Sequence, residues 1–277
     1  MDIATIGTIG AYVILGIVQG LTEFLPVSSS GHLIIERDIL HLNTPSGLAV
    51  DAVLQFATVL AVVMYFWRDI WQLIKTAWYM LVGQNIKTNS NDRTLLFALI
   101  VGTVPAVLAG LFLEKIMDTA FRSAALVAWM LIAGSGLFLI AENVASRYEA
   151  KKTISIGRGI IVGLFQSLAL IPGMSRSGAT ISGGLLLGLS REEAARFGFL
   201  LSIPIILGAG AKKMLELGVS GLLAAEWLPL VIGSVVAFAV GLVVIHYLLR
   251  YVRNHTLLAF VVYRLALAAA VFVFLMY

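Results

Sequence analysis

Six apolar segments, each about long enough to cross a bilayer, constrain the fold of this chain more than any other feature. The hydrocarbon core of a bilayer is about 30 Å thick, and a helix needs about 20 predominantly apolar residues to span it. The six segments cover residues 48–67, 94–113, 120–141, 194–211, 227–249 and 256–276. Because 60% of the 277 residues are hydrophobic and only 12% are charged, the composition lies outside the range of soluble domains. The sequence therefore predicts an all-α polytopic membrane protein with six transmembrane helices.

Two further apolar stretches, 3–42 and 155–190, are each interrupted near the middle by Pro, Gly and Ser. The interruptions fall at 26–31 and 172–178. Such residues break a helix and free backbone groups that lipid cannot satisfy, so these breaks are tolerated only inside protein or beside water. We interpret each stretch as a re-entrant helix-turn-helix hairpin that enters and leaves on one side of the membrane, with a polar tip near the midplane.

Each half of the chain then holds one hairpin and three crossings, and an odd number of crossings inverts the second half relative to the first. We expect an inverted-topology repeat with halves at about 1–145 and 153–277, within a single membrane domain of residues 1–277. The two tips follow similar lead-ins, Gly-Ile-Val-Gln-Gly-Leu at 16–21 and Gly-Leu-Phe-Gln-Ser-Leu at 163–168. This similarity favours one site that is built from two halves.

The basic residues predict an orientation. Twelve of the 19 lysines and arginines fall in loops on one side of this scheme, at 68–93, 142–158, 190–196 and 250–255, whereas Arg176 and Arg264 lie within membrane segments. Because loops rich in Lys and Arg face the cytoplasm, we expect both termini and the mouth of the first hairpin to face the outside. The net charge of +4 is small, and the lysines and arginines lie mostly in the loops that determine this orientation. We therefore expect no nucleic-acid partner.

The absence of cysteine limits the metal chemistry of the chain. Disulfides and thiolate sites are excluded, so any metal must be held by carboxylate, imidazole, hydroxyl or carbonyl groups. Ligands of this kind favour hard divalent cations such as Mg²⁺ or Ca²⁺.

The first tip gathers ionisable and hydroxyl groups among apolar neighbours. Gln19 and Glu23 are four residues apart, so a helix presents both on one face, and His32 follows the break. Ionisable groups at membrane depth are costly unless they are paired or wetted, which indicates a functional site. Three serines lie in the break and can cap the next helix, whose N-terminus would attract an anion. They are Ser28, Ser29 and Ser30.

The second tip carries Arg176 at its apex. Arginine offers a planar fork of donors and keeps its charge, which suits the oxygens of a phosphate group. A structural alternative, compatible with anion binding, is a salt bridge from Arg176 to Glu23 across the two tips. Several nearby residues supply hydroxyl groups or allow close backbone approach to a ligand. They are Gly173, Ser175, Ser177, Gly178 and Thr180.

Together the tips supply a carboxylate, an imidazole, hydroxyl groups and a permanent cation, a set that fits phosphoryl transfer. A divalent metal held by Glu23, with Gln19, would neutralise diphosphate charge. Asp51 on the following segment is a further candidate metal ligand. His32 could act as general base towards Ser29 or a water, or could itself attack phosphorus, and the sequence does not choose among these.

Two other classes of function compete with an enzyme. Broken helices and inverted repeats that meet at the midplane are typical of secondary transporters, so a transporter or flippase of a phosphorylated isoprenoid lipid is the alternative. A purely structural membrane subunit would leave the polar tips unexplained. A homodimer is one assembly that the sequence leaves open.

At these residues the chain resembles the bacterial undecaprenyl-diphosphate phosphatase family, known also for bacitracin resistance. The family pattern of Glu or Gln, three residues and Glu matches 19–23, and its Pro-Val-Ser-Ser-x-Gly-His matches 26–32. Its Pro-Gly-x-Ser-Arg-Ser-Gly-x-Thr matches 172–180, and the resemblance covers essentially the whole chain. The first position of this pattern is frequently glutamate in the family and is Gln19 here, which removes one anionic metal ligand.

The resemblance implies removal of the terminal phosphate of a polyprenyl diphosphate in the bacterial cytoplasmic membrane, which returns the carrier lipid of peptidoglycan synthesis. It also implies six crossings, two re-entrant hairpins, an outward-facing site and a divalent metal requirement. By position, the catalytic or substrate-binding residues of the family correspond to Glu23, Ser29, His32 and Arg176. Three further residues would line the site: Ser28, Ser175 and Thr180.

Overall fold

The protein is all-helical throughout the residues that its computed structural model describes, which are 3–40, 47–84, 88–119, 123–147, 150, 153–220 and 222–276. These residues form eleven helices and no strand. The helices are α1 (Ile3–Phe24), α2 (Ser29–Leu40), α3 (Gly47–Tyr65), α4 (Trp67–Leu81), α5 (Ser90–Thr119), α6 (Ala124–Ala145), α7 (Ile156–Leu168), α8 (Arg176–Leu186), α9 (Arg191–Ser220), α10 (Leu222–Asn254) and α11 (Leu258–Met276).

Five of the six predicted crossings are single helices long and apolar enough to cross a membrane. They lie in α5, α6, α9, α10 and α11. The predicted crossing at 48–67 corresponds to α3, which is followed by α4 after a bend of 78°. The all-α polytopic fold class is confirmed, although part of 120–141 lies outside the described residues.

The segment 68–93, expected to be a loop, contains the helix α4 instead. Its exposed apolar residues recur at spacings of four and three, so they form one face of the helix, and three of them are tryptophans. They are Trp67, Trp71, Ile74, Trp78 and Leu81. Tryptophan favours the boundary between membrane and water, so α4 has the composition of a helix that lies along this boundary. The charged residues on its other side obscured the helix in the hydropathy pattern.

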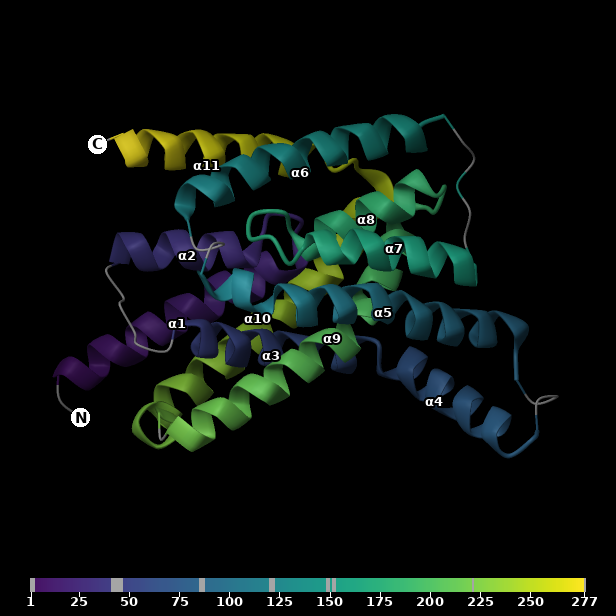
Figure 1. Ribbon diagram of the computed structural model, residues 1–277, viewed down its shortest axis with the longest axis horizontal. Helices are drawn as coiled ribbons and strands as arrows, with labels where there is room; N and C mark the ends of the chain where they lie inside the picture. Colours follow the sequence, from purple (N-terminus) through teal and green to yellow (C-terminus); the bar gives the residue numbers. More distant parts are fainter. Residues whose placement is uncertain are drawn as a thin grey trace.

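Both interrupted stretches form helical hairpins, α1 with α2 and α7 with α8. Figure 1 shows that the first hairpin enters from the end that holds both chain termini and the second from the opposite end. Their turns meet near the centre of the molecule (Figure 1). The predicted convergence of two tips is therefore what the fold produces.

Glycines allow each hairpin to pack closely on a long helix. A Cβ at Gly16 of α1 would strike the backbone of Gly233 in α10, and a Cβ at Gly163 of α7 would strike the backbone of Gly102 in α5. Small residues at helix contacts let backbones approach and give membrane helices their van der Waals packing. Gly16 and Gly163 are the first residues of the two similar lead-ins, so both hairpins are seated in the same way.

A buried apolar cluster surrounds the hairpin tips and is drawn from helices of both halves. Phe24, the last residue of α1, meets Phe199 of α9 edge-to-face at 5.5 Å between ring centroids. Phe138 of α6 lies in the same cluster and is fully buried. This packing holds the ends of the hairpin helices rigidly, which is what a site on their turns requires.

Candidate active site

The two tips bond directly to each other across 145 or more residues of sequence. The backbone N–H of Gly173 donates to Ser28 Oγ at 3.1 Å, and Ser177 Oγ donates to the carbonyl of Leu25 at 3.1 Å. Each bond joins the first hairpin to the second. The polar groups of both turns therefore face a common region.

The turns repeat one conformation. Ser28 has φ 74° and Ser175 has φ 73°, a left-handed backbone that costs a non-glycine residue on the order of 1–3 kcal/mol. In each case the serine hydroxyl accepts a hydrogen bond from the N–H three residues on, Gly31 at 3.3 Å and Gly178 at 3.2 Å. Each serine thus caps the second helix of its hairpin, which confirms the cap predicted for the first tip. Strain of this kind is typical of functional sites.

Glu23 is the hub of the site. Its side chain is only 5% exposed and forms an ion pair with Arg176, so the salt bridge proposed across the two tips is present. Gln19 Nε2 donates to Glu23 Oε2 at 2.8 Å, and Ser29 Oγ donates to the same oxygen at 2.7 Å. Both carboxylate oxygens therefore have partners, which compensates the desolvation of a buried charge.

His32 points away from this hub. Its Nδ1 lies 2.7 Å from the carbonyl of Ser28, and its Nε2 lies 2.7 Å from the hydroxyl of Tyr263 on α11. Because a carbonyl only accepts, Nδ1 carries the proton, and Nε2 of the neutral ring accepts from the tyrosine. The structure does not bring His32 to Ser29, whose hydroxyl contacts Glu23. Sequence reasoning missed Tyr263, which carries no motif.

A pocket of about 290 Å³ opens where the tips meet. Its polar wall includes predicted residues from both tips, together with Asp51 and Gln55 of α3 and Gln166 of α7. The predicted residues from the tips are Glu23, Ser28, Ser29, Ser30, Ser175 and Arg176, and Asp51 is the predicted metal ligand from α3. The remaining wall is apolar and comes from four helices and the turn after α7, with Leu33, Ala52, Ala106, Ala169, Leu170, Ile205, Ile206 and Ala209. Polar groups beside an apolar wall suit a ligand with a charged head and a hydrocarbon tail.

The other predicted site residues surround the pocket without lining it. Thr180 Oγ1 lies 3.0 Å from the carbonyl of Arg176 and so supports the first turn of α8. Ser177 Oγ lies 3.2 Å from Ser175 Oγ, and Gly173 adopts φ 96° in the turn. These residues shape the second tip. At the first tip, Gln19 bonds Glu23 and His32 bonds the carbonyl of Ser28.

The oxygen atoms near Glu23 match the ligands of a hard cation in kind. Gln19 Oε1 is buried and has no hydrogen-bond partner among the described residues, and Asp51 lines the same pocket as Glu23. Among the described residues, however, no group of three His, Asp or Glu side chains lies close enough to hold a metal. Any cation at this site would therefore need further oxygens besides carboxylates, from amide groups, hydroxyls, backbone carbonyls, water or the ligand itself.

Arg264 of α11 ties the two turns together from behind. It is fully buried, and its guanidinium donates to the carbonyls of Pro26 at 3.2 Å and of Gly173 at 2.9 Å, one in each turn. Its further bonds reach the carbonyls of Met130, Leu131 and Met174 and the hydroxyl of Ser135. The sequence placed Arg264 in a membrane crossing without a role. An arginine in such a segment is itself the signal that it has polar partners.

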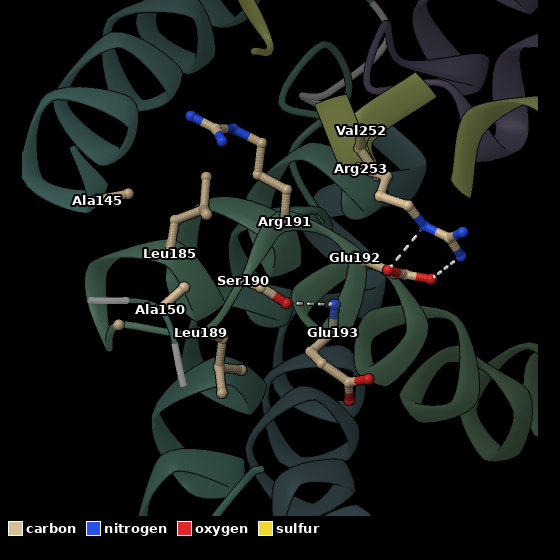
Figure 2. Close-up of a pocket in the computed structure, with 11 residues that line it drawn as sticks. Ala145, Ala150, Leu185, Leu189, Ser190, Arg191, Glu192, Glu193, Val252 and Arg253 are labelled. Atoms are coloured by element: carbon tan, nitrogen blue, oxygen red, sulfur yellow. Dashed lines mark hydrogen bonds and ion pairs between the residues drawn. The ribbon is translucent and has the colours of Figure 1, made fainter. Parts of the chain in front are cut away.

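A second pocket, of about 490 Å³, surrounds the start of α9 (Figure 2). Figure 2 shows Ser190 Oγ accepting from the N–H of Glu193, at 3.2 Å, and Glu192 paired with Arg253. Arg191 pairs with Glu142 of α6. None of the described residues that line this pocket is a predicted site residue. We therefore interpret these contacts as structural, since they cap the start of α9 and join it to neighbouring helices by ion pairs.

The comparisons with known proteins agree with the motifs. A family model described as bacitracin resistance protein BacA matches residues 12–270. A protein of Renibacterium salmoninarum named undecaprenyl-diphosphatase is 40% identical over 95% of this chain and 94% of its own length. Proteins of the same name from Myxococcus xanthus and Rubrobacter xylanophilus are each 42% identical, over 95% and 94% of this chain and 88% and 95% of their own lengths. With both tip motifs inside the matched region, the chain belongs to the BacA family of bacitracin resistance proteins.

Proposed function

We propose that this protein hydrolyses undecaprenyl diphosphate to undecaprenyl phosphate and inorganic phosphate in the bacterial cytoplasmic membrane. The observation that carries the proposal is the pocket between the two tips, where Ser29, Glu23 and Arg176 meet an apolar wall. A diphosphate group fits the polar side and an isoprenoid chain fits the apolar side. The activity would return the carrier lipid of peptidoglycan synthesis and so confer resistance to bacitracin.

In the proposed reaction Arg176 exchanges part of its contact with Glu23 for the terminal phosphate, whose oxygens match the guanidinium fork. Ser29 then attacks the terminal phosphorus while its proton moves to Glu23, which already accepts its hydrogen bond at 2.7 Å. The bond from this phosphorus to the bridging oxygen breaks and releases undecaprenyl phosphate. Water hydrolyses the phosphoserine, which restores Ser29 and gives inorganic phosphate. His32 positions the turn through the carbonyl of Ser28.

We also propose a divalent cation, Mg²⁺ or Ca²⁺, near Glu23, Gln19 and Asp51. Oxygen ligands suit these ions, and a bound cation would neutralise negative charge on the diphosphate. Addition of a chelator is expected to abolish phosphate release, and Asp51→Asn is expected to raise the Mg²⁺ concentration needed for half-maximal activity.

The test uses purified protein in detergent with a prenyl diphosphate, and measures inorganic phosphate. Ser29→Ala and Arg176→Ala are each expected to lower turnover about 10²- to 10⁴-fold, since they remove a nucleophile and a charge-stabilising donor. Ser202→Ala is the matched control, because this buried hydroxyl bonds the carbonyl of Phe199 on α9 and does not line the pocket. An intact diphosphate under all metals tried would refute the enzyme and favour a lipid carrier. Full turnover by Ser29→Ala would remove serine from the role of nucleophile.

A further inference from the structure

Gln166, near the end of α7, is a buried amide without a partner. Its side chain lines the pocket beside Glu23 and Arg176, and the residue is only 2% exposed. Neither Oε1 nor Nε2 has a hydrogen-bond partner among the described residues. An amide that is buried and unpaired destabilises a protein, so a group of this kind on the wall of a pocket points to a ligand that satisfies it.

The repeat explains why Gln166 is free. Gln19 and Gln166 are the fourth residues of the two similar lead-ins. In the first hairpin Gln19 Nε2 donates to Glu23, four residues on, at 2.8 Å. In the second hairpin the residue four positions on is Leu170, which lines the same pocket and offers no acceptor. Among the described residues, Gln166 therefore lacks a carboxylate partner of the kind that Glu23 provides for Gln19.

We propose that Gln166 binds the diphosphate of the substrate, with its side-chain NH₂ donating a hydrogen bond to a non-bridging phosphate oxygen. This inference rests on the proposed function. A phosphate oxygen is the acceptor that best fits the wall, because Ser29 and Arg176 bring further donors to the same pocket. A neutral amide adds a donor without adding another charge that must be compensated in a buried site.

If Gln166 binds the diphosphate, removal of its amide should change thermal stability and activity in opposite directions. Gln166→Met keeps the length of the side chain and removes the unpaired amide, so the unliganded protein is expected to unfold at a higher temperature. The same change removes a hydrogen bond to a charged ligand, so kcat/KM is expected to fall about 10- to 100-fold. A residue with only a structural role would lose stability and activity together.

Ser182→Ala is the matched control. Ser182 Oγ on α8 is also buried and without a partner among the described residues, but it does not line the pocket. Its replacement is expected to raise the unfolding temperature and leave kcat/KM unchanged. Gln166→Glu adds a negative charge beside the phosphate and is expected to lower kcat/KM more than Gln166→Met does.

The experiment measures the unfolding temperature of each purified variant with and without inorganic diphosphate, and kcat and KM for a prenyl diphosphate. Diphosphate is expected to raise the unfolding temperature of the wild type and to raise that of Gln166→Met less. Unchanged kcat/KM in Gln166→Met, or a lowered unfolding temperature with an undiminished response to diphosphate, would overturn the inference. If the wild type is stabilised by diphosphate but releases no phosphate, a reduced response in Gln166→Met still supports diphosphate binding, and only the proposed reaction fails.

Discussion

Single buried charges define the site at the scale of residues. Glu23 holds Arg176, Gln19 and Ser29 at once, so its carboxylate balances a cation and orients a hydroxyl. The guanidinium of Arg264 donates instead to backbone carbonyls and to one hydroxyl. The two arginines therefore have different roles. Arg176 faces the pocket, whereas Arg264 fixes the backbone of both turns.

Glu23→Gln tests how far the ion pair stabilises the fold. The change keeps the shape of the side chain but leaves Arg176 largely buried without a counter-charge, so we expect the free energy of unfolding to fall by on the order of 3 kcal/mol. Adding Arg176→Met is expected to recover much of this loss, since it removes the uncompensated charge, while phosphate release stays abolished. Chemical denaturation of the two single variants and the double variant measures the coupling. Strictly additive losses would contradict the expectation.

Arg264→Lys tests the tie between the turns. A lysine has three donors on a single nitrogen and cannot replace the bonds of Arg264 to six acceptors, so we expect a lower unfolding temperature and lower turnover. Arg253→Lys is the control, since Arg253 is exposed and forms an ion pair with Glu192, and an exposed ion pair contributes little to stability. Equal stability of the two variants would show that the carbonyl bonds of Arg264 do not hold the turns.

At the scale of elements, glycines at the contacts let the first helix of each hairpin pack closely on a long helix. We expect Gly163→Ala to destabilise the protein by about 1–3 kcal/mol, because a Cβ there strikes the backbone of Gly102 on α5. Gly136→Ala on α6 is the control, since a Cβ there meets nothing within 4 Å and alanine stabilises a helix by about 0.5–1 kcal/mol relative to glycine. Thermal unfolding of both variants measures the contrast. A neutral Gly163→Ala would mean that α5 and α7 can separate at little cost.

The helix α4 was not predicted, because residues 68–93 were expected to form a loop. Along the sequence of α4, charged residues such as Arg68 and Lys75 lie between the apolar ones. The mean hydropathy of the segment is therefore too low to indicate a crossing. The same pattern, counted at helical spacing, would have indicated a helix with one apolar face. Hydropathy finds helices that lipid surrounds and misses those that lipid touches on one side.

At the scale of the whole molecule, we propose the inverted repeat and an outward-facing site as the arrangement in the membrane. The absence of cysteine allows a direct test with two serines that flank α6, Ser123 before its start and Ser146 after its end. In intact cells, we expect a membrane-impermeant thiol reagent to label Ser123→Cys but to label Ser146→Cys only after permeabilisation. Both positions are exposed, so accessibility to solvent is matched. The reverse pattern would invert the proposed orientation.

Much of the fold could be predicted from the sequence because the sequence signals for helices and breaks are local. Long apolar runs identified the crossings, and the Pro, Gly and Ser breaks identified the two hairpins, since backbone that leaves a helix cannot face lipid. The motif residues Glu23, Ser29 and Arg176 could be proposed for the site because polar groups are conspicuous in apolar segments. A repeated lead-in also pointed to Gln166, although only Gln19 was singled out.

By itself, then, the sequence determined an all-helical membrane protein with two polar tips and the family to which it belongs. Only the tertiary structure decided which polar groups meet. Ser29 contacts Glu23 and not His32, His32 reaches Tyr263, and Gln166 has no partner among the described residues. Arg264 joins carbonyls of two turns that are more than 140 residues apart in the chain. Hydropathy is a property of a segment, whereas the partner of a buried donor depends on how distant helices pack.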